Sequence, residues 1–118
     1  TESRIANAAY FDAQLAGMAG IKLPERRSDI REVFHLYSVL CEDRDSLQRF
    51  LLGRGIDAKV HYPIPMHLQP AAAFLGHQVG DFPTTEKICG QTLSLPVHEF
   101  ISKEQQDHVI ACVKDFYG

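Results

Sequence analysis

The sequence predicts a single α+β (α/β) domain, in which a small three-stranded mixed or antiparallel sheet has helices packed on one face. Segments with helical spacing of apolar residues alternate with short runs of β-branched and aromatic residues. The order is helix, strand, helix, strand, irregular segment, helix, strand, helix. Short strands separated by helices are accommodated when the helices cover one face of a sheet. The length of 118 residues suits one domain over residues 1–118 and is too small for two.

The composition argues against two classes of partner. The formal net charge is −3, from 12 basic and 15 acidic residues, whereas a surface for nucleic acid or an anionic membrane needs a basic excess. No apolar run approaches the roughly 20 residues of a membrane span, and no signal-peptide pattern is visible. Cys41, Cys89 and Cys112 are widely spaced and include no C-x-x-C pair. We therefore expect buried or half-buried free thiols in a reducing cytoplasm.

Residues 3–19 form the first expected helix. Ala8, Phe11 and Leu15 recur at three- and four-residue steps, which places them on one stripe. Gly20 is expected to end this helix, and a charged loop is expected to follow over residues 21–31.

The first strand is predicted over residues 33–40, which are rich in β-branched and aromatic side chains. Its alternating side chains form two faces. The predicted core face is Phe34, Leu36 and Leu40, and the face expected to meet a partner or a site is Val33, His35, Tyr37 and Val39.

The middle of the chain is expected to hold a helix and a second strand. Asp43 is a suitable N-terminal cap for a helix over residues 44–54, and Gly55 is a suitable C-terminal stop. A strand is predicted over residues 57–62, and the prolines that follow it exclude regular structure.

The last part of the chain is expected to contain a third strand between two helices. A helical turn is predicted within residues 67–76, and a helix over residues 83–92 has proline at its first position. The strand at residues 93–97 is expected at a sheet edge because it contains Pro96. A capping box at residues 102–105 then predicts the final helix.

The most unusual segment is the proline-rich stretch from His61 to Pro70. It places two histidines, a tyrosine and a glutamine within ten residues on a stiffened loop. Such a loop suits a binding site, because stiffening lowers the entropic cost of ordering it. Imidazole and phenol groups suit a polar substrate.

Two other interpretations of this segment remain open. A zinc site formed by His61, His67 and His98 is conceivable, although their spacing matches no tight metal motif. Ordinary loop residues are the other alternative. No phosphate-binding glycine loop is present, so the sequence gives no motif for nucleotide binding.

Several motifs, in order along nearly the whole chain, resemble the C-terminal part of the DegT/StrS family of aminotransferases. The opening R-x-x-x-A-x-Y pattern begins at Arg4, and F-H-L-Y begins at Phe34. The more specific motifs are H-Y-P-x-P-x-H-x-Q from His61, L-G from Leu75, G-D-F-P-x-x-E from Gly80, L-S-L-P-x-H from Leu93, and S-x-E-Q-Q-x-x-V from Ser102.

The resemblance implies the fold of the C-terminal small domain of aspartate-aminotransferase-like enzymes. It implies that residues 1–118 form this small domain, and that the large domain, which binds pyridoxal phosphate (PLP), is absent from this chain. The parent would be a homodimer that transfers an amino group, from glutamate, to a nucleotide-linked keto sugar in amino-sugar or cell-surface polysaccharide biosynthesis. We therefore expect exposed apolar surface on the first helix and on the strand face with His35 and Tyr37.

The resemblance also implies a supporting role for six residues of this chain. The substrate-binding candidates are His61, Tyr62, His67, Gln69, His35 and Tyr37. These groups would position sugar hydroxyls or phosphates. No lysine here lies in a cofactor-lysine context, so the fragment is expected to contain no catalytic residue and to bind no PLP alone.

Two alternatives to an aminotransferase parent remain. The chain could be a non-catalytic module that binds a sugar nucleotide or docks onto a protein. The parent could also lack the cofactor lysine and catalyse a PLP-dependent dehydration.

Overall fold

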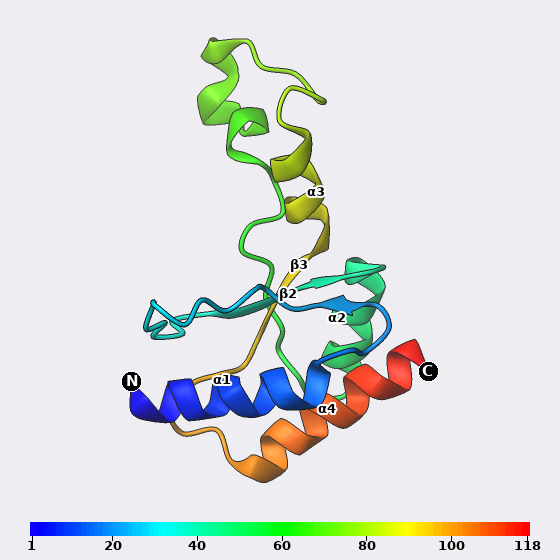
Figure 1. The fold of residues 1–118 in the computed structure, drawn as a ribbon. Helices are drawn as coiled ribbons and strands as arrows, with labels where there is room; N and C mark the ends of the chain where they lie inside the picture. The colour runs from blue at the N-terminus through cyan, green and yellow to red at the C-terminus, as the bar shows by residue number, and fades with distance from the viewer.

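The computed structural model describes all residues 1–118, which form four α-helices, three strands and two short 3₁₀ helices (Figure 1). Their order and bounds are α1 (Glu2–Leu15), β1 (Ile21–Lys22), β2 (Tyr37–Cys41), α2 (Arg44–Gly53), η1 (Met66–Leu68), η2 (Pro70–Leu75), α3 (Pro83–Gln91), β3 (Thr92–Leu95) and α4 (Lys103–Tyr117). None of these helices combines the length and the apolar character that crossing a membrane requires.

The sheet is antiparallel, in the order β1-β2-β3, which confirms one of the two predicted sheet types. Tyr37 pairs with Leu95 across the β2–β3 ladder. Two predictions about which residues form strands were wrong, one for a loop and one for a strand. Residues 21–22, expected in a loop, pair with the end of β2. The segment 57–62 forms no strand, because only Lys59 is bridged to the sheet, opposite Ser94.

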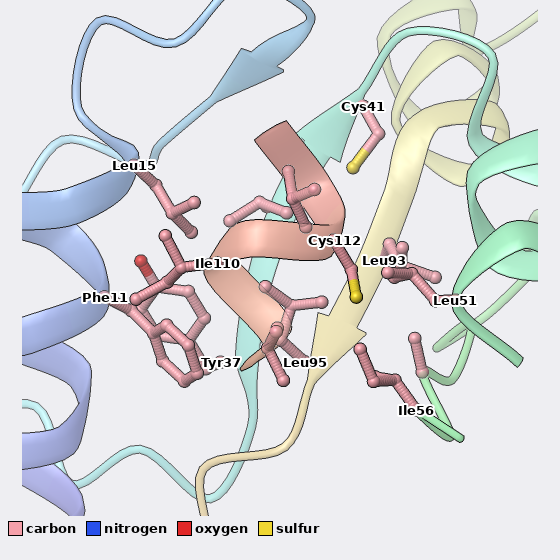
Figure 2. Packing of buried hydrophobic residues seen from close by; sticks show 14 of the residues in the cluster. Phe11, Leu15, Tyr37, Cys41, Leu51, Ile56, Leu93, Leu95, Ile110 and Cys112 are labelled. Atoms are coloured by element: carbon pink, nitrogen blue, oxygen red, sulfur yellow. The ribbon is translucent and has the colours of Figure 1, made fainter. Parts of the chain in front are cut away.

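The face of β2 that enters the core is the opposite of the predicted one. Tyr37, Val39 and Cys41 are buried, whereas Leu36 is exposed. The reason is that α1 covers this face and places Phe11 against Tyr37, with ring centroids 5.1 Å apart. Figure 2 shows Phe11 and Tyr37 packed among α1, α4 and the sheet. Both alternating sets contain apolar residues, so the strand pattern alone did not distinguish the faces.

One core of 17 buried residues joins α1, α2 and α4 to the same side of the sheet. The first helix ends at Leu15, earlier than predicted, and exposes no large apolar side chain. The expectation of apolar surface on this helix was therefore wrong, because its apolar stripe is already covered by the core.

The ends of the helices were predicted with mixed success. The final helix has the expected capping box: Gln105 N donates to Ser102 Oγ over 3.1 Å, and Ser102 N donates to Gln105 Oε1 over 2.8 Å. Asp43 precedes α2 as expected, but its side chain makes no capping hydrogen bond. Its backbone is left-handed, with φ at 50°, a conformation that aspartate tolerates better than most residues.

Residues 62–91, called the arm below, project away from the rest of the molecule (Figure 1). The arm contains η1, η2 and α3, and none of its residues is buried. The radius of gyration is 15.5 Å, whereas a compact chain of this length has about 13.5 Å. The arm accounts for this elongation.

The base of the arm is attached to the core by a buried arginine. Arg44 Nη1 donates to Cys89 O and to Thr92 O, each over 2.9 Å. The side chain of Arg44 is only 7% exposed, and its Nε pairs with Asp45 over 2.7 Å. The carbonyls at the end of α3, which a helix leaves without partners, thus accept hydrogen bonds from Arg44. Arg44 therefore fixes the direction in which the arm leaves the sheet.

Candidate functional site

The candidate site is an open groove of about 410 Å³ beside β3. Its walls come from the start of α1, the residues before β2, the segment bridged to β3 and the residues after β3. The lining residues are Arg4, His35, Leu36, Asp57, Lys59, His61, Ser94, Leu95, Pro96, Val97 and His98. The groove thus gathers three histidines and two cationic side chains from separate parts of the chain.

The two cations of the groove are in different environments. Lys59 Nζ pairs with Asp57 Oδ1 over 3.0 Å, so a carboxylate balances its charge. Arg4 Nη1 donates to Phe34 O over 3.1 Å and to His35 O over 3.2 Å. Backbone carbonyls hold Arg4 in place without neutralising it, and its other donors remain available. A polar or anionic ligand suits such a groove.

His61 is a predicted site residue that lines this groove. Its Nδ1 lies 3.1 Å from Ser94 Oγ, and its Nε2 has no partner within the chain. His35, also predicted, lines the same groove. Tyr62 stands edge-on to His61, with ring centroids 5.4 Å apart, but is 68% exposed and lies outside the groove. The structure therefore brings His35 and His61 together and leaves Tyr62 at the base of the arm.

His67 lies in the arm, within a different cluster. Its Nε2 is 3.2 Å from Glu86 Oε2, and its side chain is only 7% exposed. The His67 ring packs against Phe82 with centroids 4.7 Å apart. In this structure the imidazole links η1 to the start of α3 and presents little surface to a ligand. A substrate contact by His67 stays a prediction, and the visible role of the residue is structural.

Gln69 also makes a bond inside the arm. Its Nε2 donates to Ile64 O over 3.2 Å, which closes the loop around η1. The amide is therefore engaged in holding the proline-rich segment. A substrate contact by Gln69 likewise stays a prediction.

Tyr37 is fully buried, so its expected position on an open strand face was wrong. Its hydroxyl donates to Asp12 Oδ1 over 2.7 Å. Burial, together with this bond to a carboxylate, raises the pKa of Tyr37 far above its usual range. Tyr37 leaves no phenol surface in the groove and acts as part of the core.

Five polar groove residues were not predicted as substrate-binding: Arg4, Asp57, Lys59, Ser94 and His98. Of these, His98 was named only as a conceivable zinc ligand. Arg4 and the motif from Leu93 to His98 were part of the family resemblance, so a signal for three of them was present. Their meeting depends on a tertiary contact, because the bridge between Lys59 and Ser94 brings two distant segments together. The spacing along the chain carries no information about this contact.

A second, larger hollow of about 510 Å³ lies at the N-terminal end of α4. It shares Asp57, Pro96 and His98 with the groove. His108 in this hollow donates from Nε2 to Arg54 O over 2.9 Å, a bond that closes the end of α2. The groove is the better candidate site because it holds the free guanidinium donors of Arg4 and the free nitrogen of His61.

The structure gives the zinc alternative no support. No group of three His, Cys, Asp or Glu side chains is placed to hold a metal ion. His61 and His67 belong to the two separate clusters described above. The three cysteines are unpaired, and Cys41 and Cys112 are buried. Burial raises the pKa of Cys41 to about 11, which makes it a poor nucleophile at neutral pH.

Comparison with known proteins agrees with the α+β fold. The model of the DegT/DnrJ/EryC1/StrS aminotransferase family matches residues 1–114. The chain belongs to this family, and its structural neighbours are sugar aminotransferases of the PLP fold.

Two curated relatives illustrate the similarity. The chain is 43% identical over 107 residues to the erythromycin biosynthesis sensory transduction protein EryC1 of Saccharopolyspora erythraea, covering 91% of this chain and 29% of that protein. It is 41% identical over 113 residues to the dTDP-3-amino-3,4,6-trideoxy-α-D-glucose transaminase of Streptomyces venezuelae, covering 96% and 30%.

The crystal structure of S. venezuelae DesV, in complex with a ketimine intermediate, superposes with a TM-score of 0.94 at 40% identity. That match covers 98% of this chain and 31% of DesV. The chain therefore spans about 30% of the length of the curated relatives that it matches.

Proposed function

We propose that the chain is the C-terminal small domain of a cytoplasmic, PLP-dependent aminotransferase that transfers an amino group, from glutamate, to a nucleotide-linked keto sugar. The observation that carries this proposal is the groove with Arg4, His35 and His61, in a chain whose relatives include a transaminase named for a dTDP-linked amino sugar. Arginine and imidazole N–H groups suit the hydroxyls and diphosphate of such a ligand.

This chain's residues would bind and orient the sugar nucleotide. Arg4 is held by two backbone carbonyls and so can present its remaining donors without rearranging. His61 is held at Nδ1 and offers Nε2. Preorganised donors of this kind lower the entropic cost of binding and place the reacting carbon for transfer.

The cofactor would be held by the rest of the protein. PLP supplies the electron sink for transamination and needs a lysine to form its Schiff base. The five lysines of this chain, Lys22, Lys59, Lys87, Lys103 and Lys114, are all exposed. No lysine stands in an enclosed pocket, so the residues of this chain alone do not fit the cofactor.

We assign the contact with the remainder of the protein to the arm, in place of the first helix and the strand face with His35 and Tyr37, where apolar surface was expected. Its exposed apolar side chains include Met66 at 80%, Phe74 at 85% and Val79 at 80% exposure. Apolar surface of this kind marks an interface. We propose that a large domain of the same enzyme, in a homodimer, covers the arm and completes the site.

Kinetics of the full-length protein test the proposal. With a nucleotide-linked keto sugar and glutamate as substrates, His61→Ala should raise the KM for the sugar nucleotide about tenfold, with PLP absorbance unchanged. His108→Asn on α4, outside the groove, is the matched control and should leave that KM unchanged. Equal effects of both variants, or an unaltered KM in His61→Ala, would remove the groove from the substrate site.

A non-catalytic module is the second candidate, favoured by the regulatory name of the EryC1 relative. The aminotransferase and the non-catalytic module differ in whether the full-length protein converts its substrate. Conversion of the keto sugar to an amino sugar supports the enzyme. Saturable binding of the sugar nucleotide without conversion, and no PLP adduct on any lysine after borohydride reduction, supports the module.

A further inference from the structure

Ser94 is a polar side chain buried at the floor of the groove. The residue is 5% exposed, and its side chain lies on the sheet face opposite the core. Its Oγ stands 2.9 Å from Ser38 Oγ and 3.1 Å from His61 Nδ1. The three side chains form a continuous hydrogen-bonded chain that ends at the groove.

The backbone fixes Ser94 on both sides. Ser38 is its direct partner in the β2–β3 register. On the other side, Ser94 N donates to Lys59 O over 2.7 Å, and Lys59 N donates to Ser94 O over 3.0 Å. These bonds place Lys59, and hence His61 two residues later, beside β3. The hydroxyl of Ser94 therefore occupies a rigid position between its two partners.

The hydrogen bonds among Ser38, Ser94 and His61 leave one ring nitrogen of His61 free. A serine hydroxyl donates one hydrogen bond and accepts others, so Ser94 can donate to one neighbour while it accepts from the other. Whether His61 Nδ1 donates to Ser94 or accepts from it, this nitrogen is engaged, and Nε2 has no partner within the protein. A hydrogen bond at one ring nitrogen of histidine determines whether the other nitrogen carries a proton and where it points.

We infer that Ser94, oriented by Ser38, is a positioning residue that holds His61 by Nδ1 and presents Nε2 to the ligand in the groove. The inference rests on the proposed function, because the ligand is the sugar nucleotide assigned to the groove. Ser94 itself contacts no substrate in this arrangement. It limits rotation of the imidazole, so that less entropy is lost when Nε2 binds.

Nuclear magnetic resonance of the histidine ring nitrogens in the 118-residue chain tests the hydrogen bond directly. The His61 ring should show the ¹⁵N shifts of a single tautomer at neutral pH. Ser94→Ala should shift both nitrogens toward the averaged values of free imidazole, and Ser94→Thr, which keeps the hydroxyl, should restore them. His108, held by Arg54 O, is the internal control. Unchanged His61 shifts in Ser94→Ala would overturn the inference.

Two further measurements keep the test decisive. Ser94→Cys keeps nearly the same volume with a weak hydrogen-bonding group, so it replaces Ser94→Ala if the latter fails to fold, with the same expected shifts. In the full-length enzyme, Ser94→Ala should raise the KM for the sugar nucleotide about five- to tenfold and leave the KM for the amino donor unchanged.

The two readouts separate the inference from the proposed function. Altered ring shifts with both KM values unchanged would show that Ser94 holds His61 but that His61 does not meet the substrate, which overturns the proposed site and the positioning role with it. Unaltered ring shifts overturn the role of Ser94 alone. A Thr92→Ala variant, on the same strand without contact to His61, should leave the shifts and both KM values unchanged.

Discussion

The carboxylate of Asp12 on α1 binds both Tyr37 of β2 and Arg26 of the loop before β2. Its Oδ1 accepts from the hydroxyl of Tyr37 over 2.7 Å, and Arg26 pairs with both of its oxygens at 3.1 and 3.2 Å. The guanidinium of Arg26 also lies over the rings of Phe34 and Tyr37, at 4.9 and 5.6 Å. Tyr37 is thus both an apolar core residue and the buried end of a charged network.

Removal of the Tyr37 hydroxyl should therefore destabilise the fold. Tyr37→Phe keeps the ring in the core but removes a hydrogen bond to a carboxylate, which costs about 2 kcal/mol in free energy of unfolding. Urea denaturation followed by circular dichroism measures this loss. Tyr10→Phe, which removes the solvent-exposed bond to Asp107, is the control and should have a much smaller effect. Equal effects of both would contradict the structural role of Tyr37.

Helix α2 ends through local backbone geometry. Gly55 has φ at 79°, Ile56 N donates to Leu51 O over 2.9 Å, and Gly55 N donates to Leu52 O over 3.1 Å. This pair of bonds is the Schellman motif, and Ile56 continues into the core at 4% exposure. The glycine is required because the left-handed conformation is unfavourable for residues with a Cβ.

Two glycines of this region should respond oppositely to alanine. Gly55→Ala should destabilise the chain by roughly 1–2 kcal/mol, because it forces alanine into the left-handed conformation. Gly53→Ala lies within α2, where nothing stands within 4 Å of the added methyl, and should be neutral or stabilising by up to about 1 kcal/mol. Thermal unfolding of both variants measures the difference. Two effects of equal sign would contradict this assignment of the helix end.

The arm has no buried residues of its own. Its polar contacts centre on Glu86. Its carboxylate accepts from Gly80 N over 2.8 Å and from Phe82 N over 3.1 Å, besides its contact with His67. The Gly80 N–H, followed by Phe82 N–H and His67, holds the pKa of Glu86 below its ordinary value of 4.5. Glu86 therefore stabilises the turn in its ionised form.

Acidification should loosen this turn before the core unfolds. A lowered pKa in the folded state means that the contribution of Glu86 is complete above pH 4.5 and is lost as the pH falls through the folded-state pKa. The Glu86 carboxyl ¹³C resonance should titrate below pH 4.5. The neighbouring titratable groups, His67, His77 and Asp81, should be followed in the same titration.

A charge-removing substitution at Glu86 should act on the arm alone. In Glu86→Gln the amide protons of Gly80 and Phe82 should exchange faster at pH 7, whereas those of β2 should not change. Glu104→Gln, in the first turn of α4 and remote from the arm, is the matched control. Exchange that is unchanged throughout Glu86→Gln would show that the carboxylate does not hold the turn.

At the scale of the whole molecule, the apolar surface is concentrated on the arm. Eight of the large apolar side chains that are exposed lie there: Tyr62, Ile64, Met66, Phe74, Leu75, Val79, Phe82 and Ile88. The helices α1 and α4 instead bury their apolar stripes in the common core. The surface that needs a partner is therefore the projecting element.

The isolated chain should self-associate through the arm as its concentration rises. Sedimentation velocity or light scattering should show a growing mean mass, and the double substitution Met66→Ser with Phe74→Ser should shift this association to higher concentration. Phe100→Ser, an equally exposed phenylalanine at 84% outside the arm, is the control. A strict monomer at all concentrations, or an equal effect of Phe100→Ser, would contradict the assignment.

The sequence by itself determined the fold class, the presence of the four helices and several of their ends. The capping box at Ser102, the stop at Gly55 and the proline that begins α3 were all predicted and confirmed. These features depend on residues within about four positions of one another, so the local order of residue types is sufficient to specify them. The family resemblance likewise follows from residues at fixed spacing.

The tertiary structure alone decided which side of β2 faces the core and which polar groups meet. Phe11 of α1 fixes the buried face through Tyr37, whereas an alternating strand with apolar residues on both faces leaves this choice open. His67 meets Glu86 from 19 positions away, and His61 meets Ser94 from 33 positions away. Contacts of that separation depend on how the helices and strands pack, which local propensity does not specify.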